Sequence, residues 1–71
     1  MDKLRAIEYF NRAVHSGTFA GAARFFDVST PAVTQLIAAL ERSLGTVLFY
    51  RSNRGLALTT DGERYYAMSQ A

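Results

Sequence analysis

The feature that most constrains the fold is a two-residue break, Asp27-Val28, between two helical hydrophobic patterns. The second pattern opens at Ser29-Thr30-Pro31, where proline in the first turn of a helix loses no hydrogen bond. Because so short a connection has no room for a loop, the two helices must cross steeply. This arrangement predicts a helix-turn-helix over about residues 19–38.

Apolar residues at spacings of three and four predict the core faces of three helices. These residues are Leu4, Ile7, Phe10 and Val14 in residues 2–15; Phe19, Ala22, Ala23 and Phe26 in residues 19–26; and Val33, Ile37, Leu40 and Leu44 in the third helix. Ser16-Gly17 is expected to end the first helix, and Thr18 to cap the second. Ser29 or Thr30 is expected to cap the third helix, which stops at Gly45.

The remaining residues predict a hairpin and a fourth helix. Residues 47–50 and 56–59 are short, partly apolar and β-prone, and the polar run Arg51-Ser52-Asn53-Arg54-Gly55 lies between them. Thr60-Asp61-Gly62-Glu63 follows the capping-box pattern, so a fourth helix should begin at Thr60 and run to Ala71. The expected fold class is mainly α: a winged helix-turn-helix of three helices and a two-stranded β wing, followed by the start of another helix.

Composition limits the other functions that the chain could have. Its 71 residues suffice for one small domain, and the absence of cysteine excludes disulfides and thiolate metal sites. The lone His15 makes no zinc site, and neither a Ser-His-Asp arrangement nor a glycine-rich phosphate loop is present. No apolar run is long enough for a membrane span, and the N-terminus lacks a signal-peptide pattern. We therefore expect a cytoplasmic protein that is neither an enzyme nor membrane-bound.

The exposed face of the third helix carries residue types that suit the reading of DNA bases. Thr30 and Thr34 each offer a hydroxyl and a methyl group, and Gln35 can pair bidentately with adenine. Pro31 and Ala38 are small enough to allow close approach and to touch a thymine methyl group. The first N–H groups of the helix can hold a phosphate. We therefore expect this helix to enter the major groove of double-stranded DNA.

Basic residues gather in the predicted wing. The net charge of +2 is a small excess, but no acidic residue lies between Glu41 and Asp61, where Arg51 and Arg54 stand. Arg54 is expected in the minor groove, because arginine favours the narrow groove of A·T-rich DNA. Arg51 is expected on a phosphate, which adds affinity and salt dependence without sequence information.

A joint pattern runs along almost the whole chain without a gap. It comprises Phe10, Ser16-Gly17-Thr18-Phe19, Ala22-Ala23, Val28-Ser29-Thr30-Pro31-Ala32-Val33-Thr34, Ile37, Leu40-Glu41, Leu44-Gly45, Leu48-Phe49-Tyr50-Arg51, Leu58-Thr59 and Gly62. With this pattern the chain resembles the N-terminal DNA-binding domain of LysR-type bacterial transcription regulators.

The resemblance implies a winged helix-turn-helix over residues 1–59 and the start of a linker helix over residues 60–71. In this family the linker helix pairs two domains, giving a homodimer or tetramer on a partly symmetric, A·T-containing site. A further effector-binding domain, which binds a small-molecule co-inducer, is expected outside this chain. The segment itself is expected to hold no cofactor.

The resemblance also assigns site residues. Its base-contact positions fall on Thr30, Pro31, Thr34 and Gln35, and its minor-groove wing residue is Arg54. The full set expected to bind DNA is Thr18, Ser29, Thr30, Pro31, Thr34, Gln35, Ala38, Arg51 and Arg54. Tyr65 and Tyr66 lie on the helix that pairs and are expected at the dimer interface, although packing within the chain would also explain them.

Some residues depart from the family pattern. Many members have glutamine in place of Thr30, and Ala38 and Ala39 replace residues that are often basic. Leu36 and Phe25 stand where polar residues are common. We therefore expect the helix to draw less affinity from phosphates and the wing to supply more. A winged helix that contacts only proteins is the alternative, but it predicts an acidic or apolar face on the third helix.

Overall fold

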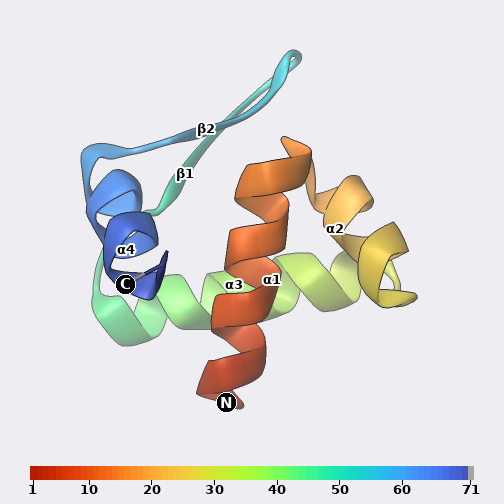
Figure 1. Ribbon diagram of the computed structural model, residues 1–71, viewed down its shortest axis with the longest axis horizontal. Coiled ribbons are helices and arrows are strands. Elements are labelled where there is room, and N and C mark those ends of the chain that lie inside the picture. Colours follow the sequence, from red (N-terminus) through yellow and green to blue (C-terminus); the bar gives the residue numbers. More distant parts are fainter. Residues whose placement is uncertain (71) are drawn as a thin grey trace.

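The computed structural model describes residues 1–70 (Figure 1). Its elements, in chain order, are α1 (Lys3–Ser16), α2 (Phe19–Phe26), α3 (Thr30–Leu44), β1 (Phe49–Ser52), β2 (Gly55–Leu58) and α4 (Thr60–Gln70). In Figure 1, α1 crosses α3, α2 lies toward one end of α3, and α4 lies toward the other. The fold is the mainly α winged helix-turn-helix that the sequence predicts, and β1 and β2 form its wing.

Local capping explains where the first three helices begin. Asp2 caps α1, Thr18 caps α2 and Ser29 caps α3, and each side chain accepts a hydrogen bond from the N–H three residues further on. Ser29, rather than Thr30, is therefore the cap of α3. The predicted ends at Gly17 and Gly45 are confirmed, since both residues adopt the left-handed conformation just past a helix.

The sharp corner of the helix-turn-helix depends on Asp27. This residue has a φ of 57° and ends α2, while the N–H of Val28 donates to the carbonyl oxygen of Ala23 at 3.0 Å. These features form a Schellman-type end, which satisfies the last carbonyls of α2 within the turn itself. As a result, only three residues separate α3 from α2, and α3 is held at a fixed angle to it.

The core lies where α1, α2 and α3 meet beneath the base of the hairpin. Its buried members are Ala6, Tyr9, Phe10, Ala13, Phe19, Ala22, Ala23, Val33, Ile37, Leu40, Leu48 and Phe49. The Phe10 ring is the aromatic centre, 5.3 Å from the Phe49 ring and 5.4 Å from the Tyr65 ring between centroids. The predicted core faces of α2 and α3 lie in this core, although Phe26 and Leu44 are half-buried.

The predicted stripe on α1 is partly wrong. Leu4 is 70% exposed, and Ile7 and Val14 are only half-buried. The buried face instead runs through Ala6 and Ala13 beside Phe10 and Tyr9. The small side chains of Ala6 and Ala13 let α2 and α3 approach α1 closely. A prediction based on the large aliphatic residues therefore does not find the contact face.

The hairpin is displaced from its predicted position. Phe49 pairs with Leu58 and Ser52 with Gly55, so Asn53 and Arg54 form the tip. Arg51 lies inside β1 rather than in the tip. The first strand starts late because the backbone before Phe49 is already bonded elsewhere: the N–H of Leu48 donates to the Glu41 carboxylate at 2.7 Å.

The predicted cap of the fourth helix is also wrong, because Thr59 fills this role and Thr60 does not. The Thr59 hydroxyl accepts from the N–H of Gly62 at 2.9 Å and donates to the carbonyl oxygen of Val47 at 2.6 Å. Thr59 is buried, whereas Thr60 is exposed and is the first helical residue. Tertiary contact with the base of the hairpin, which the local pattern does not reveal, selects between the two threonines.

The helix α4 runs to Gln70, and the predicted continuation at Ala71 lies outside the described residues. Near its end, the Ser69 hydroxyl donates to Asn11 Oδ1 on α1 at 2.8 Å. The helix is therefore tied to α1 as well as to the hairpin base. Within residues 1–70, no helix combines the length and apolar character needed to cross a membrane.

Candidate nucleic-acid interface

One side of α3 is free to meet a ligand. Buried Val33, Ile37 and Leu40 fix the opposite side of this helix in the core. We call the free side the reading face; it consists of Thr30, Pro31, Thr34, Gln35 and Ala38. Thr30, Pro31 and Gln35 are exposed, whereas Thr34 and Ala38 are half-buried. The structure therefore brings these predicted residues together on one surface in the N-terminal half of α3.

Hydrogen bonds within α3 limit what the reading face can offer. The Thr34 hydroxyl donates to the carbonyl oxygen of Pro31 at 3.1 Å, so its proton is engaged while its lone pairs and methyl group remain available. The Ser29 hydroxyl accepts from the N–H of Ala32 at 3.2 Å. In this arrangement Thr34 can accept a hydrogen bond from an amino group, while the exposed amide of Gln35 can both donate and accept.

The reading face consists of uncharged residues, and nearby charges lie around it. Glu41 is the next acidic residue along α3, but its carboxylate is directed to the N–H of Leu48 at the hairpin base. Arg5 of α1 shares an open surface pocket with Gln35 and Leu36. Sequence reasoning missed Arg5, because nothing in its spacing shows that α1 passes beside α3 at this point.

The wing places its two arginines differently. Arg54 is exposed in the two-residue tip, where its N–H donates to the Ser52 hydroxyl at 3.2 Å. The Arg51 guanidinium lies over the Phe19 ring, 4.9 Å from its centroid, while the residue as a whole stays exposed. Arg54 therefore lies in the tip, as predicted, whereas Arg51 lies in β1 and faces the start of α2.

Thr18 lies at the corner between α1 and α2. Its side chain is exposed, and its hydroxyl accepts from the N–H of Gly21 at 2.9 Å as the cap of α2. Because the hydroxyl hydrogen is still available, a cap of this kind can also donate to an anion. Phe19 and Arg51 lie at the same corner.

The residues expected at a dimer interface also have a role within the chain. Tyr65 and Tyr66 are half-buried, and their rings meet the Phe10 ring edge-on at 5.4 and 6.2 Å between centroids. Packing therefore explains at least part of both side chains. On the same helix, Met68 is 67% exposed.

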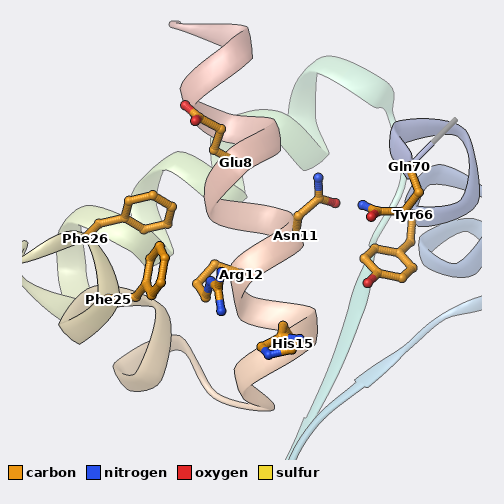
Figure 2. Close-up of a pocket in the computed structure, with 8 residues that line it drawn as sticks. All are labelled: Glu8, Asn11, Arg12, His15, Phe25, Phe26, Tyr66 and Gln70. Carbon is orange, nitrogen blue, oxygen red and sulfur yellow. The ribbon is translucent and has the colours of Figure 1, made fainter.

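A pocket between α1, α2 and α4 collects polar and aromatic side chains (Figure 2). In this pocket the Arg12 guanidinium lies 3.6 Å from the centroid of the Phe25 ring, and Phe25 itself is 58% exposed. Leu36, the other residue that stands where polar residues are common, is half-buried against the core. Across residues 1–70, no group of three or more histidine, cysteine, aspartate or glutamate side chains could hold a metal ion.

Comparison with known proteins places this geometry in context. Residues 4–63 match the family model described as bacterial regulatory helix-turn-helix protein, lysR family. The HTH-type transcriptional regulator ClcR of Pseudomonas putida is 40% identical over 63 residues, which are 89% of this chain and 21% of that protein. TfdS of Cupriavidus pinatubonensis is 43% identical over the same shares of both chains. The chain thus spans about a fifth of the length of these curated relatives.

Solved structures agree with the sequence relatives. A complex of the CbnR DNA-binding domain with DNA has a TM-score of 0.91 and 37% identity, covering 99% of this chain and 79% of that one. A complex of the BenM DNA-binding domain with the catB site 1 DNA has a TM-score of 0.91 and 30% identity, covering 99% of this chain and 78% of that one.

Proposed function

Because the chain belongs to the LysR family of bacterial regulatory helix-turn-helix proteins, we propose that it is a sequence-specific reader of double-stranded DNA. The observation that carries the proposal is the pairing of two surfaces. An uncharged polar face occupies the capped N-terminal half of α3, and an exposed arginine occupies the tip of the wing. A helix of this kind fits the major groove, and an arginine on a thin β-ribbon fits the minor groove.

The residues divide into base contacts and backbone contacts. Thr30, Pro31, Thr34 and Gln35, with Ala38 at the edge, would meet base edges and thymine methyl groups. Gln35 is the best base reader among them, since its exposed amide can pair with N6 and N7 of adenine. The face carries no charge of its own, so its contribution is discrimination more than affinity.

Phosphate contacts would come from the start of the helices and from the wing. Thr18 and Ser29 lie at the N-termini of α2 and α3, where free N–H groups and the helix dipole favour an anion. Arg51 would reach a phosphate from its place over the Phe19 ring, whereas Arg54 would enter the minor groove. Arg5, beside Gln35, is a further candidate for a phosphate contact.

We propose that two copies act together on a partly symmetric, A·T-containing site. Residues 1–59 would form the DNA-binding unit, and α4 from Thr60 onward would begin the helix that joins two copies, with Tyr65 and Tyr66 near that interface. Two half-site contacts combine strongly only when one body holds both readers. Residues beyond this chain would carry the domain that binds a small-molecule co-inducer, and the whole regulator would act on DNA in the cytoplasm.

Selection of duplexes from a random pool tests this function. The 71-residue chain, and the same chain joined at its C-terminus to an unrelated dimerising coiled coil, would each be used to recover bound duplexes. We expect a common half-site from both, with paired half-sites and tighter binding for the dimeric form. Affinity should fall with rising salt, because phosphate contacts release counterions.

The same experiment can overturn the proposal. Failure of the dimeric form to bind any duplex at low salt would favour the alternative, a winged helix that contacts only proteins. Binding that recovers no common sequence would leave a non-specific DNA-binding domain and remove the role proposed for the reading face.

A further inference from the structure

The outer part of the wing approaches the helices closely at Gly55. The N–H of Leu56 donates to the carbonyl oxygen of Gly17, at the corner between α1 and α2, with an N···O distance of 2.9 Å. Gly55 has a φ of 107°, and a Cβ atom added there would lie 2.7 Å from the same oxygen. Any residue with a side chain would therefore push the wing and the corner apart. We call the Leu56–Gly17 hydrogen bond, together with this close approach, the wing clasp.

The clasp is formed by the outer edge of β2, the edge that faces away from β1. Leu56 lies opposite Arg51, and alternate residues of an antiparallel strand direct their N–H groups away from the partner strand. The outward N–H of Leu56 is satisfied by Gly17 rather than by water. The Arg51 guanidinium, over the Phe19 ring, is a second contact between the hairpin and the same corner.

The hairpin is thus held at both ends. At its base, the N–H of Thr59 donates to the carbonyl oxygen of Leu48 at 3.0 Å, and Thr59 caps α4. Near its tip, the clasp holds the residue that follows Arg54. Figure 1 shows the two strands rising from the side of α4, with the tip extending beyond the corner between α1 and α2.

The position of the wing arginine follows from this arrangement. The corner that accepts the clasp is also the start of α2, which is joined to α3 by the short turn after Asp27. Arg54 is therefore connected to the reading face through the clasp, the helix α2 and the short turn after Asp27. We infer that Gly55 is a positioning residue that sets the offset between the base pairs read by α3 and the flanking minor groove read by Arg54. The inference rests on the proposed function, because it assigns that function a specificity determinant.

The first part of the test asks whether the clasp depends on glycine. Gly55→Ala would be compared with Gly45→Ala, since Gly45 also has a positive φ of 71° but a Cβ there meets nothing within 4 Å. Both variants carry backbone strain, and only the first adds the clash. By amide hydrogen exchange, we expect Leu56 to lose protection in Gly55→Ala and to keep it in Gly45→Ala.

The second part measures flank preference. Each protein would bind a half-site selected from the random pool, flanked by either A·T or G·C pairs, and the ratio of the two affinities would be recorded. We expect Gly55→Ala to lower this ratio to the value of Arg54→Ala, and the double variant to lower it no further. Gly45→Ala should keep the ratio of the unchanged chain, and all these variants should keep the base preference that depends on Gln35.

A variant without added strain keeps the test decisive if Gly55→Ala fails to fold. Chemical synthesis can replace Leu56 by its α-hydroxy acid, so that an ester oxygen stands in place of the N–H. The donor is lost and the Gly55 carbonyl becomes a weaker acceptor, but no side chain is added at the clasp. This variant should also lower the flank ratio. An unchanged ratio in either variant with an open clasp, or additive effects with Arg54→Ala, would overturn the inference. If the unchanged sequence binds no duplex even when it is joined to the dimerising coiled coil, the proposed function itself fails.

Discussion

The reading face of α3 and the wing are built in opposite ways, although both are proposed to meet DNA. The reading face is uncharged and rests on buried Val33, Ile37 and Leu40. The wing carries Arg51 on β1 and Arg54 in its tip, and backbone and polar contacts at its two ends hold it together with Phe49, which is buried in the core. The reading face is fixed by hydrophobic packing, whereas the wing depends on a few hydrogen bonds in addition to the packing of Phe49 in the core.

Because the two surfaces are built differently, we expect the reading face to supply discrimination between bases and the wing to supply binding affinity. Base edges are read through hydrogen bonds and methyl contacts, which need a rigid surface, whereas phosphates and groove potential respond to charge. A neutral face on a packed helix suits the first task. Charged side chains on a narrow ribbon suit the second, so changes in the two regions should produce different kinds of defect.

The largest effect is expected from removing the packing beneath the reading face. Leu40→Ala should lower the free energy of unfolding by about 2–5 kcal/mol, since it opens a cavity in the core. Urea unfolding of the 71-residue chain measures this loss. The matched control is Gln35→Ala on the same helix, which is exposed and should change stability by no more than about 0.5 kcal/mol. Similar losses for both would mean that α3 is not anchored as described.

On DNA, the same Gln35→Ala variant should show a defect that the stability measurement does not. We expect a loss of roughly 1–3 kcal/mol that is confined to one base pair of each half-site. Binding to a series of single-base variants of the selected half-site measures it. Arg42→Ala, at the far end of α3, is the control. Equal losses on selected and random duplexes would show that Gln35 does not read a base.

The base of the wing should depend on one hydroxyl group. Thr59→Val keeps the shape of the side chain but removes both of its hydrogen bonds, so it should lower stability by about 1–3 kcal/mol. Thr60→Val is the control, because Thr60 is exposed. Thermal unfolding would distinguish the two variants. A larger loss of stability for Thr60→Val would show that Thr60, as the local pattern predicts, caps α4.

The smallest effect is expected at the wing tip. Arg54→Ala should leave stability unchanged and reduce the slope of log affinity against log salt by about 1. The loss should be greatest on duplexes with A·T flanks, whereas Arg51→Ala should weaken binding equally on both flanks. If Arg54→Ala also affects both flanks equally, then Arg54 contacts a phosphate and the contrast between the two arginines disappears.

Much of the fold could be predicted because its signals are local. Thr18 and the glycines at positions 17 and 45 mark helix ends through contacts within a few residues. The core faces of α2 and α3 follow from spacing alone. The α1 face and the cap at Thr59 could not be found in this way, because both are decided by what packs against them from distant parts of the chain.

The candidate site shows the same division. The reading face was predictable because its residues share one side of one helix. The orientation of Arg51 toward Phe19, the proximity of Arg5 to Gln35 and the closeness of Gly55 to Gly17 involve segments far apart in the sequence. The spacing of residues along the chain does not predict these contacts.

The two-point attachment of the hairpin has a consequence for how such a domain can be altered. Along the chain, the Asn53–Arg54 tip lies between the two attachments and outside every helix, so we expect that its length can change without moving a helix. Once the two-residue turn has become a flexible loop, each further doubling of its length costs only about 0.6 kcal/mol. Insertions at the tip would therefore extend the reach of the arginine along the duplex, while the packed helices stay as they are. Selection or design could thus adjust target spacing at this position independently of stability.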